Sequence, residues 1–168
     1  RDFKKAGHWP TLVSAFLYFD FSFMVWVTLG PLMVYIAADQ GFGVEDKFTL
    51  VAIPILAGAG FRIVLGALAD HFGGRRTALA AQAAVIAAVA WVWLVGPHGK
   101  SEFEMLGVAL GIAGASFAGA LPQASRWYPP RYQGVVMGLA AAGNMGVVLD
   151  ALIVPSLAES HGWRNAFG

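Results

Sequence analysis

Apolar residues fill five long stretches of this chain, and short polar or charged connections separate them. The five stretches are Thr11–Ala37, Phe48–Ala69, Thr77–Val95, Phe103–Ser125 and Gln133–Ala158. A helix needs about 20 apolar residues to cross the hydrocarbon core of a bilayer, and every stretch is close to this length or longer. The alternation of polar and apolar residues that is typical of a membrane-spanning barrel is absent. The sequence therefore predicts an all-α membrane protein with five transmembrane helices.

The connections carry the helix breakers and most of the charge. They are Ala38–Lys47, Asp70–Arg76, Gly96–Glu102 and Arg126–Tyr132, which contains Pro129–Pro130. Hydrophobic residues make up 58% of the chain and charged residues 12%, and the mean hydropathy is +0.64. These values are typical of membrane proteins rather than of soluble domains. Because the chain has no cysteine, no disulfide or thiolate metal site is expected.

Lysine and arginine are divided unequally between the two ends of the predicted bundle. If the N-terminus is cytoplasmic, seven of them lie on the cytoplasmic side: Arg1, Lys4, Lys5, Arg75, Arg76, Arg126 and Arg131. The opposite side then holds three: Lys47, Lys100 and Arg164. This bias predicts a multi-pass protein of the cytoplasmic (inner) membrane with its N-terminus in the cytoplasm. The basic residues form no stripe that would bind nucleic acid.

The final segment, Gly162–Gly168, passes from polar to apolar residues, as the start of a sixth helix would. Five helices alone would place the two termini on opposite sides of the membrane. We therefore expect the chain to be part of a longer protein, truncated before a sixth helix.

Arg62 is the one charged residue inside the stretch Phe48–Ala69. A charge that faces lipid at this depth costs several kcal/mol. Gly58 and Gly66 lie one turn away on either side, so a backbone or a small ligand could approach the guanidinium. The planar fork of arginine matches planar oxyanions bidentately. Arg62 is therefore a candidate anion site, and the alternative is an ion pair with Asp20 that makes both residues insertable.

Several polar or aromatic groups fall near the middle of the predicted helices. Counting about 1.5 Å per residue places Asp20, Arg62, Phe117 and Asn144 about 11–17 Å from the cytoplasmic end. Secondary transporters bind their substrates at this depth. Asp20 is a candidate for proton coupling, with a structural ion pair or a protonated hydrogen-bond donor as the alternatives. Asp150, about 26 Å along its helix, is expected to be solvated near the outer interface.

Small residues recur at every fourth position in two of the stretches. The fifth stretch carries Gly134, Gly138, Ala142 and Gly146, and the fourth carries Gly107, Gly111, Ala115 and Gly119. Such stripes allow another helix to pack closely. Asn144 lies among the small residues of 142–146, where it could contact a ligand or form a hydrogen bond to a neighbouring helix.

The connection between the second and third stretches resembles the loop signature of the major facilitator superfamily, Gly-x-x-x-Asp-Arg/Lys-x-Gly-Arg-Arg/Lys. The matching residues are Gly66, Asp70, Gly73 and Arg75. His71 and Gly74 stand where the signature has basic residues. The resemblance implies that the matching charges bridge neighbouring helices and bias a conformational cycle.

Seven further elements together resemble the nitrate/nitrite porter family of that superfamily. They are Trp9–Thr11, the segment around Asp20, Arg62, 113–118, 125–130, 142–146 and 162–165. The resemblance implies that Arg62 binds the anion and that Phe117 packs against it. It also implies that Asn144, with Gly143 and Gly146, lines the site. The family signature Gly-Asn-x-Gly corresponds to Gly143–Gly146.

The same resemblance implies an alternating-access carrier of about twelve helices in two halves. This chain would supply most of the N-terminal half bundle, and the missing C-terminal half would supply a second arginine and a second signature. The implied partners are nitrate or nitrite, the lipid bilayer and the C-terminal half. The sequence leaves open whether the carrier exchanges the two anions or couples uptake to protons.

Other classes of protein fit the sequence less well than a carrier does. An intramembrane hydrolase would rely on Ser116, but the four histidines, His8, His71, His98 and His161, lie in connections or at helix ends. This leaves no base beside the serine and no metal cluster, so we expect no enzyme activity, cofactor or metal. A carrier for another small anion and a channel or assembly subunit that pairs through its glycine-rich helices stay open.

Overall fold

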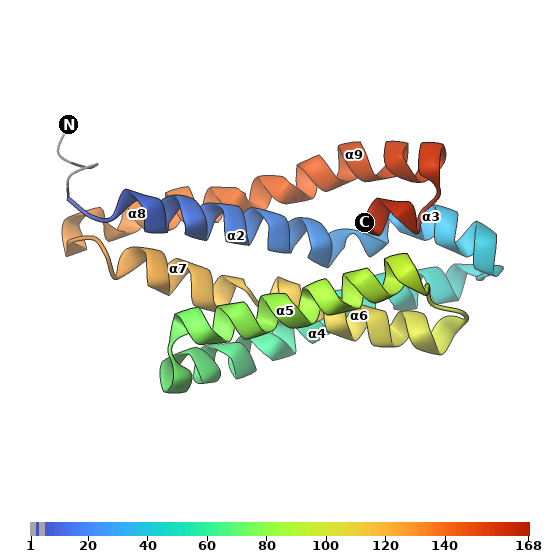
Figure 1. Ribbon diagram of the computed structural model, residues 1–168, viewed down its shortest axis with the longest axis horizontal. Helices are drawn as coiled ribbons and strands as arrows, with labels where there is room; N and C mark the ends of the chain where they lie inside the picture. The colour runs from blue at the N-terminus through green and yellow to red at the C-terminus, as the bar shows by residue number, and fades with distance from the viewer. Residues whose placement is uncertain (1–2, 4–5) are drawn as a thin grey trace.

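The computed structural model describes residue 3 and residues 6–168, without the side chains at positions 117, 119, 120 and 123. Helices account for the regular structure in this part of the chain (Figure 1). In order they are α2 (Trp9–Val27), α3 (Leu29–Gln40), α4 (Val44–Phe72), α5 (Gly74–Leu94), α6 (Lys100–Gly114), α7 (Phe117–Ser125), α8 (Pro130–Ala141), the 3₁₀ turn η1 (Ala142–Met145), α9 (Gly146–His161) and the 3₁₀ turn η2 (Asn165–Phe167). The predicted all-α class is confirmed.

Each predicted stretch is helical, but three of the five are interrupted. Within the described residues, four helical segments are long and apolar enough to cross a membrane: Trp9–Gln40, Val44–Phe72, Gly74–Leu94 and Pro130–His161. The expectation of one continuous helix over Phe103–Ser125 was wrong, because α6 ends at Gly114 and α7 begins at Phe117. Between them the amide of Ala115 reaches the carbonyls of both Gly111 and Ile112, and the tighter 3₁₀-type bonding ends α6.

The first stretch is interrupted at Thr28, which separates α2 from α3. Pro31 has no amide hydrogen, so it cannot donate to the carbonyl of Val27 as a helical residue would. The fifth stretch is interrupted by η1 within its run of small residues. Both interruptions lie in the middle of membrane-length segments, and α2 packs directly against η1 and α9.

The connections gather at the two ends of an elongated bundle (Figure 1). The turn at Gly73, whose φ of +89° favours glycine, and the connection 126–129 lie at one end. The connections 41–43 and 95–99 and the segment after α9 lie at the other. The basic residues of the two sides therefore separate as the sequence predicts, although Arg1, Lys4 and Lys5 lie outside the described residues.

Two buried clusters hold the helices together. One joins α2, α7 and α8 through Phe19, Phe23, Leu121, Tyr128 and Val136. The other joins α3, α4, α6, α9 and η2, and includes Leu32, Ile36, Leu50, Phe103, Leu110, Trp163 and Phe167. By contrast, α4 exposes Phe48, Leu56 and Ile63. Apolar exposure on this scale is typical of a surface that faces lipid or another helix.

Candidate functional site

Two glycines of the Gly-Asn-x-Gly segment bring η1 and α9 into contact with the backbone of α2. A Cβ atom added at Gly143 would lie 2.8 Å from the carbonyl oxygen of Phe16 and 3.0 Å from the amide nitrogen of Asp20. A Cβ atom at Gly146 would overlap the carbonyl oxygen of Asp20. Residues three apart eclipse one another in a 3₁₀ turn, which explains why both glycines lie on the same face. We call this contact the α2–α9 seam.

The close packing predicted for the fifth stretch is confined to one end of its glycine stripe. Gly146 lies in the α2–α9 seam, but a Cβ atom at Gly134 or Gly138 would meet no described atom within 4 Å. The prediction was therefore wrong for those two positions within the described part of the chain. In the fourth stretch it is confirmed, because a Cβ atom at Gly111 would lie 2.5 Å from Ala57 Cβ and one at Gly107 would lie 2.9 Å from Ile53.

Asn144 is exposed, whereas Gly143 and Gly146 are buried. The sequence grouped these residues as lining one site, and the structure shows that they differ in exposure. The glycines set the distance between α2 and α9, and the amide of Asn144 is presented to the surroundings of the helix.

Arg62 is partly buried on α4 and contacts two other helices. Its Nε atom donates to the carbonyl oxygen of Gly114 at 3.4 Å, and its Cζ atom lies 5.4 Å from the centre of the Trp26 ring. Gly114 ends α6, so its carbonyl belongs to the negative end of that helix dipole. The Trp26 face adds a cation–π attraction. Both contacts stabilise the guanidinium without neutralising its charge.

Trp26 occupies the space beside Gly58 in which a backbone or ligand was predicted to approach Arg62. Its indole nitrogen donates to the carbonyl oxygen of Pro54 at 2.8 Å. A Cβ atom at Gly58 would lie 3.0 Å from that nitrogen, and a Cβ atom at Gly114 would overlap the ring. On the other side of Arg62, a Cβ atom at Gly66 would meet no described atom within 4 Å. The predicted close approach therefore holds at Gly58, where α2 supplies the neighbour.

Asp20 is buried in the α2–α9 seam, with 7% of its surface exposed. Its Oδ1 atom is enclosed and has no hydrogen-bond partner among the described residues. Asp20 and Trp26 both belong to α2, so this helix connects the Gly-Asn-x-Gly segment to Arg62. The ion pair between Asp20 and Arg62 stays a prediction, and the side chain of Phe117 lies outside the described residues.

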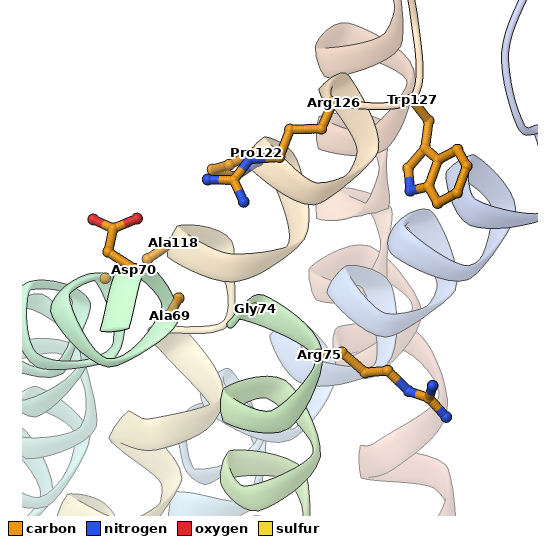
Figure 2. Close-up of a pocket in the computed structure, with 9 residues that line it drawn as sticks. Ala69, Asp70, Gly74, Arg75, Ala118, Pro122, Arg126 and Trp127 are labelled. Carbon is orange, nitrogen blue, oxygen red and sulfur yellow. The ribbon is translucent and has the colours of Figure 1, made fainter. Parts of the chain in front are cut away.

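The loop residues line a cavity of about 360 Å³ at the end of the bundle that holds Gly73 (Figure 2). Gly66, Asp70 and Arg75 contribute to its wall, together with Arg126 and Trp127 at the end of α7. In Figure 2 the Arg126 side chain extends across Pro122 towards the side of Asp70, whereas that of Arg75 points away. The structure thus brings Arg126, at the end of α7, into the same cavity as the predicted loop charges Asp70 and Arg75.

Asp150 contradicts the expectation that it is solvated. It is 1% exposed, and neither carboxyl oxygen has a hydrogen-bond partner within the described part of the chain. The depth estimate located Asp150 along the helix but could not say which face it occupies. The spacing was an available signal, because Asp150 continues the line of Gly138, Ala142 and Gly146 by one further step of four residues.

The family of the chain follows from its similarity to known proteins. A family model described as Major Facilitator Superfamily matches residues 9–168. The chain belongs to the Major Facilitator Superfamily. The predicted class of multi-pass membrane protein is confirmed by this match and by the four membrane-length segments.

Curated relatives narrow the resemblance within the superfamily. The chain is 37% identical over 135 residues to a probable nitrate/nitrite transporter, NarK2, of Mycobacterium tuberculosis, which covers 80% of this chain and 34% of that protein. It is 31% identical over 145 residues to a nitrite extrusion protein of Bacillus subtilis, covering 85% and 36%. A probable nitrate/nitrite antiporter, NarK1, of Thermus thermophilus is 32% identical over 145 residues, covering 86% and 32%.

These matches confirm the predicted resemblance to the nitrate/nitrite porters of the superfamily. The chain spans about a third of the length of these major facilitator relatives. Arg62, the α2–α9 seam and the loop cavity are therefore features of one part of a longer kind of protein.

Proposed function

We propose that this chain is the N-terminal part of a secondary carrier that moves nitrate or nitrite by alternating access. Its proposed partners are the anion, the lipid bilayer and the C-terminal half of the carrier. The observation that carries the proposal is Arg62, a cation on a membrane-length helix that is held by Trp26 and Gly114. The relatives also support the proposal, because they are named as a probable nitrate/nitrite transporter and a nitrite extrusion protein.

Arg62 suits a planar oxyanion because of the shape of its guanidinium. Nitrate and nitrite present coplanar oxygens, which the guanidinium fork can bind in parallel. The bond from Nε to Gly114 fixes the plane of the fork relative to α6, and the Trp26 ring covers it without supplying a counter-charge. Because the guanidinium is already oriented, less side-chain entropy is lost when the anion binds.

The remaining site residues have proposed roles around Arg62. Phe117 packs against the planar anion, and the exposed amide of Asn144 lines the path. Gly143 and Gly146 hold α2 against α9, so they determine where Asp20 and Trp26 stand. Asp20 either carries a proton or pairs with Arg62.

The loop residues have a proposed role in the conformational cycle. Gly66, Asp70 and Arg75 line the cavity at one end of α4 and α5, and Gly73 lies between these two helices. Charges in this position can bridge helices in one state and separate in the other, which biases the equilibrium between the two states.

Arg62→Lys in the full-length carrier tests the anion site. The variant keeps the charge but loses the planar fork, so counterflow of labelled nitrate into proteoliposomes should fall severely at equal incorporation. Arg76→Lys, a matched change at an exposed arginine, should leave counterflow unchanged. Normal counterflow with Arg62→Lys would make Arg62 structural. Saturable counterflow also separates a carrier from the channel alternative, which would conduct without exchange.

We also propose that the N-terminus faces the cytoplasm of the inner membrane. His71 and Ser101 are exposed near opposite ends of the bundle. In a full-length protein without other cysteines, cysteine at position 71 should react with an impermeant maleimide only from the cytoplasmic side, and cysteine at 101 only from outside. The reverse pattern would invert the orientation, and labelling of both from one side would contradict the helix arrangement.

A further inference from the structure

Asp150 is an ionisable group that the proposed anion site does not use. It lies on α9 one turn after Gly146, where α9 packs against α2 and α3. Both of its carboxyl oxygens are enclosed and make no hydrogen bond of ordinary geometry to a described residue, and the Thr28 hydroxyl is the polar side chain that acts on them. Asp20 has one such oxygen and Asp150 has two. Asp150 is thus the more completely enclosed of the two carboxyl groups on this seam.

Thr28 faces the Asp150 carboxyl from the break between α2 and α3. Its own side chain is also buried. Pro31 cannot donate to the Val27 carbonyl, so one backbone bond is missing beside Thr28, although the Leu32 amide still donates to the Thr28 carbonyl at 3.3 Å. A missing bond of this kind is a point where a helix can bend, so α3 can change its angle to α2 here. The carboxyl therefore lies against the weakened point of the first membrane segment.

None of the charged or titratable groups described on the neighbouring helices donates to Asp150. On α2, Asp20 contacts Gly146 through its backbone. On α3, the Tyr35 hydroxyl donates to Glu159 at 2.9 Å, and Asp39 accepts from Trp163 at 3.2 Å. Among the described residues, Thr28 is the side chain that acts on the Asp150 carboxyl, and no cation does.

Arg164, which precedes η2, donates to the carbonyl oxygen of Val95 at the end of α5. It therefore supplies no counter-charge to Asp150 in this arrangement. An enclosed carboxylate without a cation costs much more free energy than the neutral acid. The closed seam is compatible with a carboxylic acid, and opening it to water would favour release of the proton.

We propose that Asp150 is a proton-binding site of the carrier, and that opening of the seam at Thr28 exchanges its proton with water. This inference rests on the proposed transport function. The carboxylate takes a proton from water on one side of the membrane when the seam opens there. With the seam closed, the acid can donate its O–H to the Thr28 hydroxyl oxygen. When the seam opens to the other side, the same O–H bond breaks and the proton leaves to water, so no other reactant is needed.

The test uses full-length protein in proteoliposomes and separates coupling from anion binding. Asp150→Asn resembles the neutral acid in shape but cannot release a proton. It should retain nitrate counterflow without a pH gradient and lose the accumulation that an inward proton gradient drives. Asp46→Asn, at an exposed end of α4, should retain both activities. If Asp150→Asn accumulates nitrate as the unmodified protein does, the proposal is wrong.

Loss of both activities at normal incorporation would also overturn the proposal, because Asp150 would then be required for anion movement itself. If the unmodified protein shows no nitrate counterflow, the proposed function fails, and a second measurement still tests Asp150. Dicyclohexylcarbodiimide reacts with protonated carboxyl groups in apolar surroundings. Its attachment to Asp150, read by peptide mass spectrometry, should decrease from mildly acidic to mildly alkaline pH. Attachment that is absent or independent of pH would show that the carboxyl does not exchange a proton in this range.

Discussion

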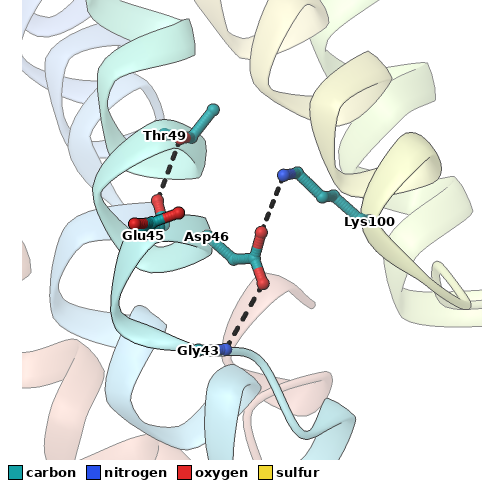
Figure 3. A network of polar contacts seen from close by, with 5 residues as sticks. All are labelled: Gly43, Glu45, Asp46, Thr49 and Lys100. Atoms are coloured by element: carbon teal, nitrogen blue, oxygen red, sulfur yellow. Dashed lines mark hydrogen bonds and ion pairs between the residues drawn. The ribbon is translucent and has the colours of Figure 1, made fainter.

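At the end of the bundle that holds Lys100, polar side chains have partners, whereas several in the α2–α9 seam do not. Lys100 Nζ lies 2.7 Å from Asp46 Oδ1, and the amide of Gly43 donates to Asp46 Oδ2 at 3.3 Å (Figure 3). Asp39 and Glu159 also accept hydrogen bonds at this end. In the interior, by contrast, enclosed oxygens of Asp20, Ser22 and Asp150 have no partner among the described residues.

The contrast separates polar groups that fix the structure from groups that are free to change their partners. A satisfied group at a helix end holds that end in place, as Asp46 does when it accepts a hydrogen bond from the Gly43 amide at the start of α4. An enclosed polar oxygen without a partner costs about 1–3 kcal/mol, so each such group in a native protein requires an explanation. The proposed proton exchange would account for Asp150, and the proposed anion cycle would account for Asp20.

Gly146→Ala should have the largest effect, on both stability and nitrate counterflow, because it would force α2 and α9 apart at the seam. The new methyl group would overlap the backbone carbonyl of Asp20, which cannot move aside as a side chain could. Overpacking costs about 1–3 kcal/mol even where side chains adjust, and we expect at least this loss here. Thermal unfolding in detergent and nitrate counterflow measure the effect. Gly138→Ala, which has open space, should leave both unchanged. Equal behaviour of the two variants would show that the seam is not a tight contact.

Trp163→Ala should rank second because it should lower stability alone and leave nitrate counterflow unchanged. Trp163 is 7% exposed, and its ring centre lies 5.7 Å from that of Phe103. Loss of a buried tryptophan costs about 3–5 kcal/mol. Trp163→Phe retains most of the packing and removes the bond to Asp39, which should cost about 1 kcal/mol. Melting temperatures of the two variants measure the difference. Equal losses would assign the stability to the hydrogen bond rather than to packing.

The general fold could be predicted from the sequence because membrane helices are specified by the length of their apolar runs. All five stretches are helical, and Arg62 was identified because a lone charge is conspicuous in such a run. The interruptions were not predicted, because apolar character continues across Thr28 and across 115–116. Pro31 was a usable signal for the first of them.

The position of a residue along its helix does not predict which neighbouring helix its side chain contacts. Depth counting placed Asp150 near the interface, but its burial depends on which face meets α2 and α3. The contact of Trp26 with Arg62 depends in the same way on how α2, α4 and α6 pack. The glycine pattern predicted close packing, but it did not show that Gly134 and Gly138 lie outside the contact.

Ser22→Ala should have a small effect of opposite sign to the first two variants. Ser22 is 1% exposed, and its Oγ atom has no partner within the described part of the chain. Removing an unsatisfied hydroxyl from an apolar interior should therefore raise stability, by up to about 1–3 kcal/mol. The melting temperature should rise while nitrate counterflow is unchanged. A fall in counterflow would instead identify Ser22 as a group that meets the anion or a proton during the cycle.

Lys100→Met should have the smallest effect, although it removes the ion pair with Asp46. Both side chains remain substantially exposed, at 47% and 31%, so water and salt screen the attraction. Asp46 also keeps its bond from the Gly43 amide, which holds the start of α4 in place without the lysine. The melting temperature of Lys100→Met should therefore match that of the unmodified protein at both low and high salt. A marked loss at low salt that disappears at high salt would show that this pair contributes to joining α4 and α6. The hydrogen-bonded and paired side chains at this end would then contribute more to the free energy of unfolding than their exposure indicates.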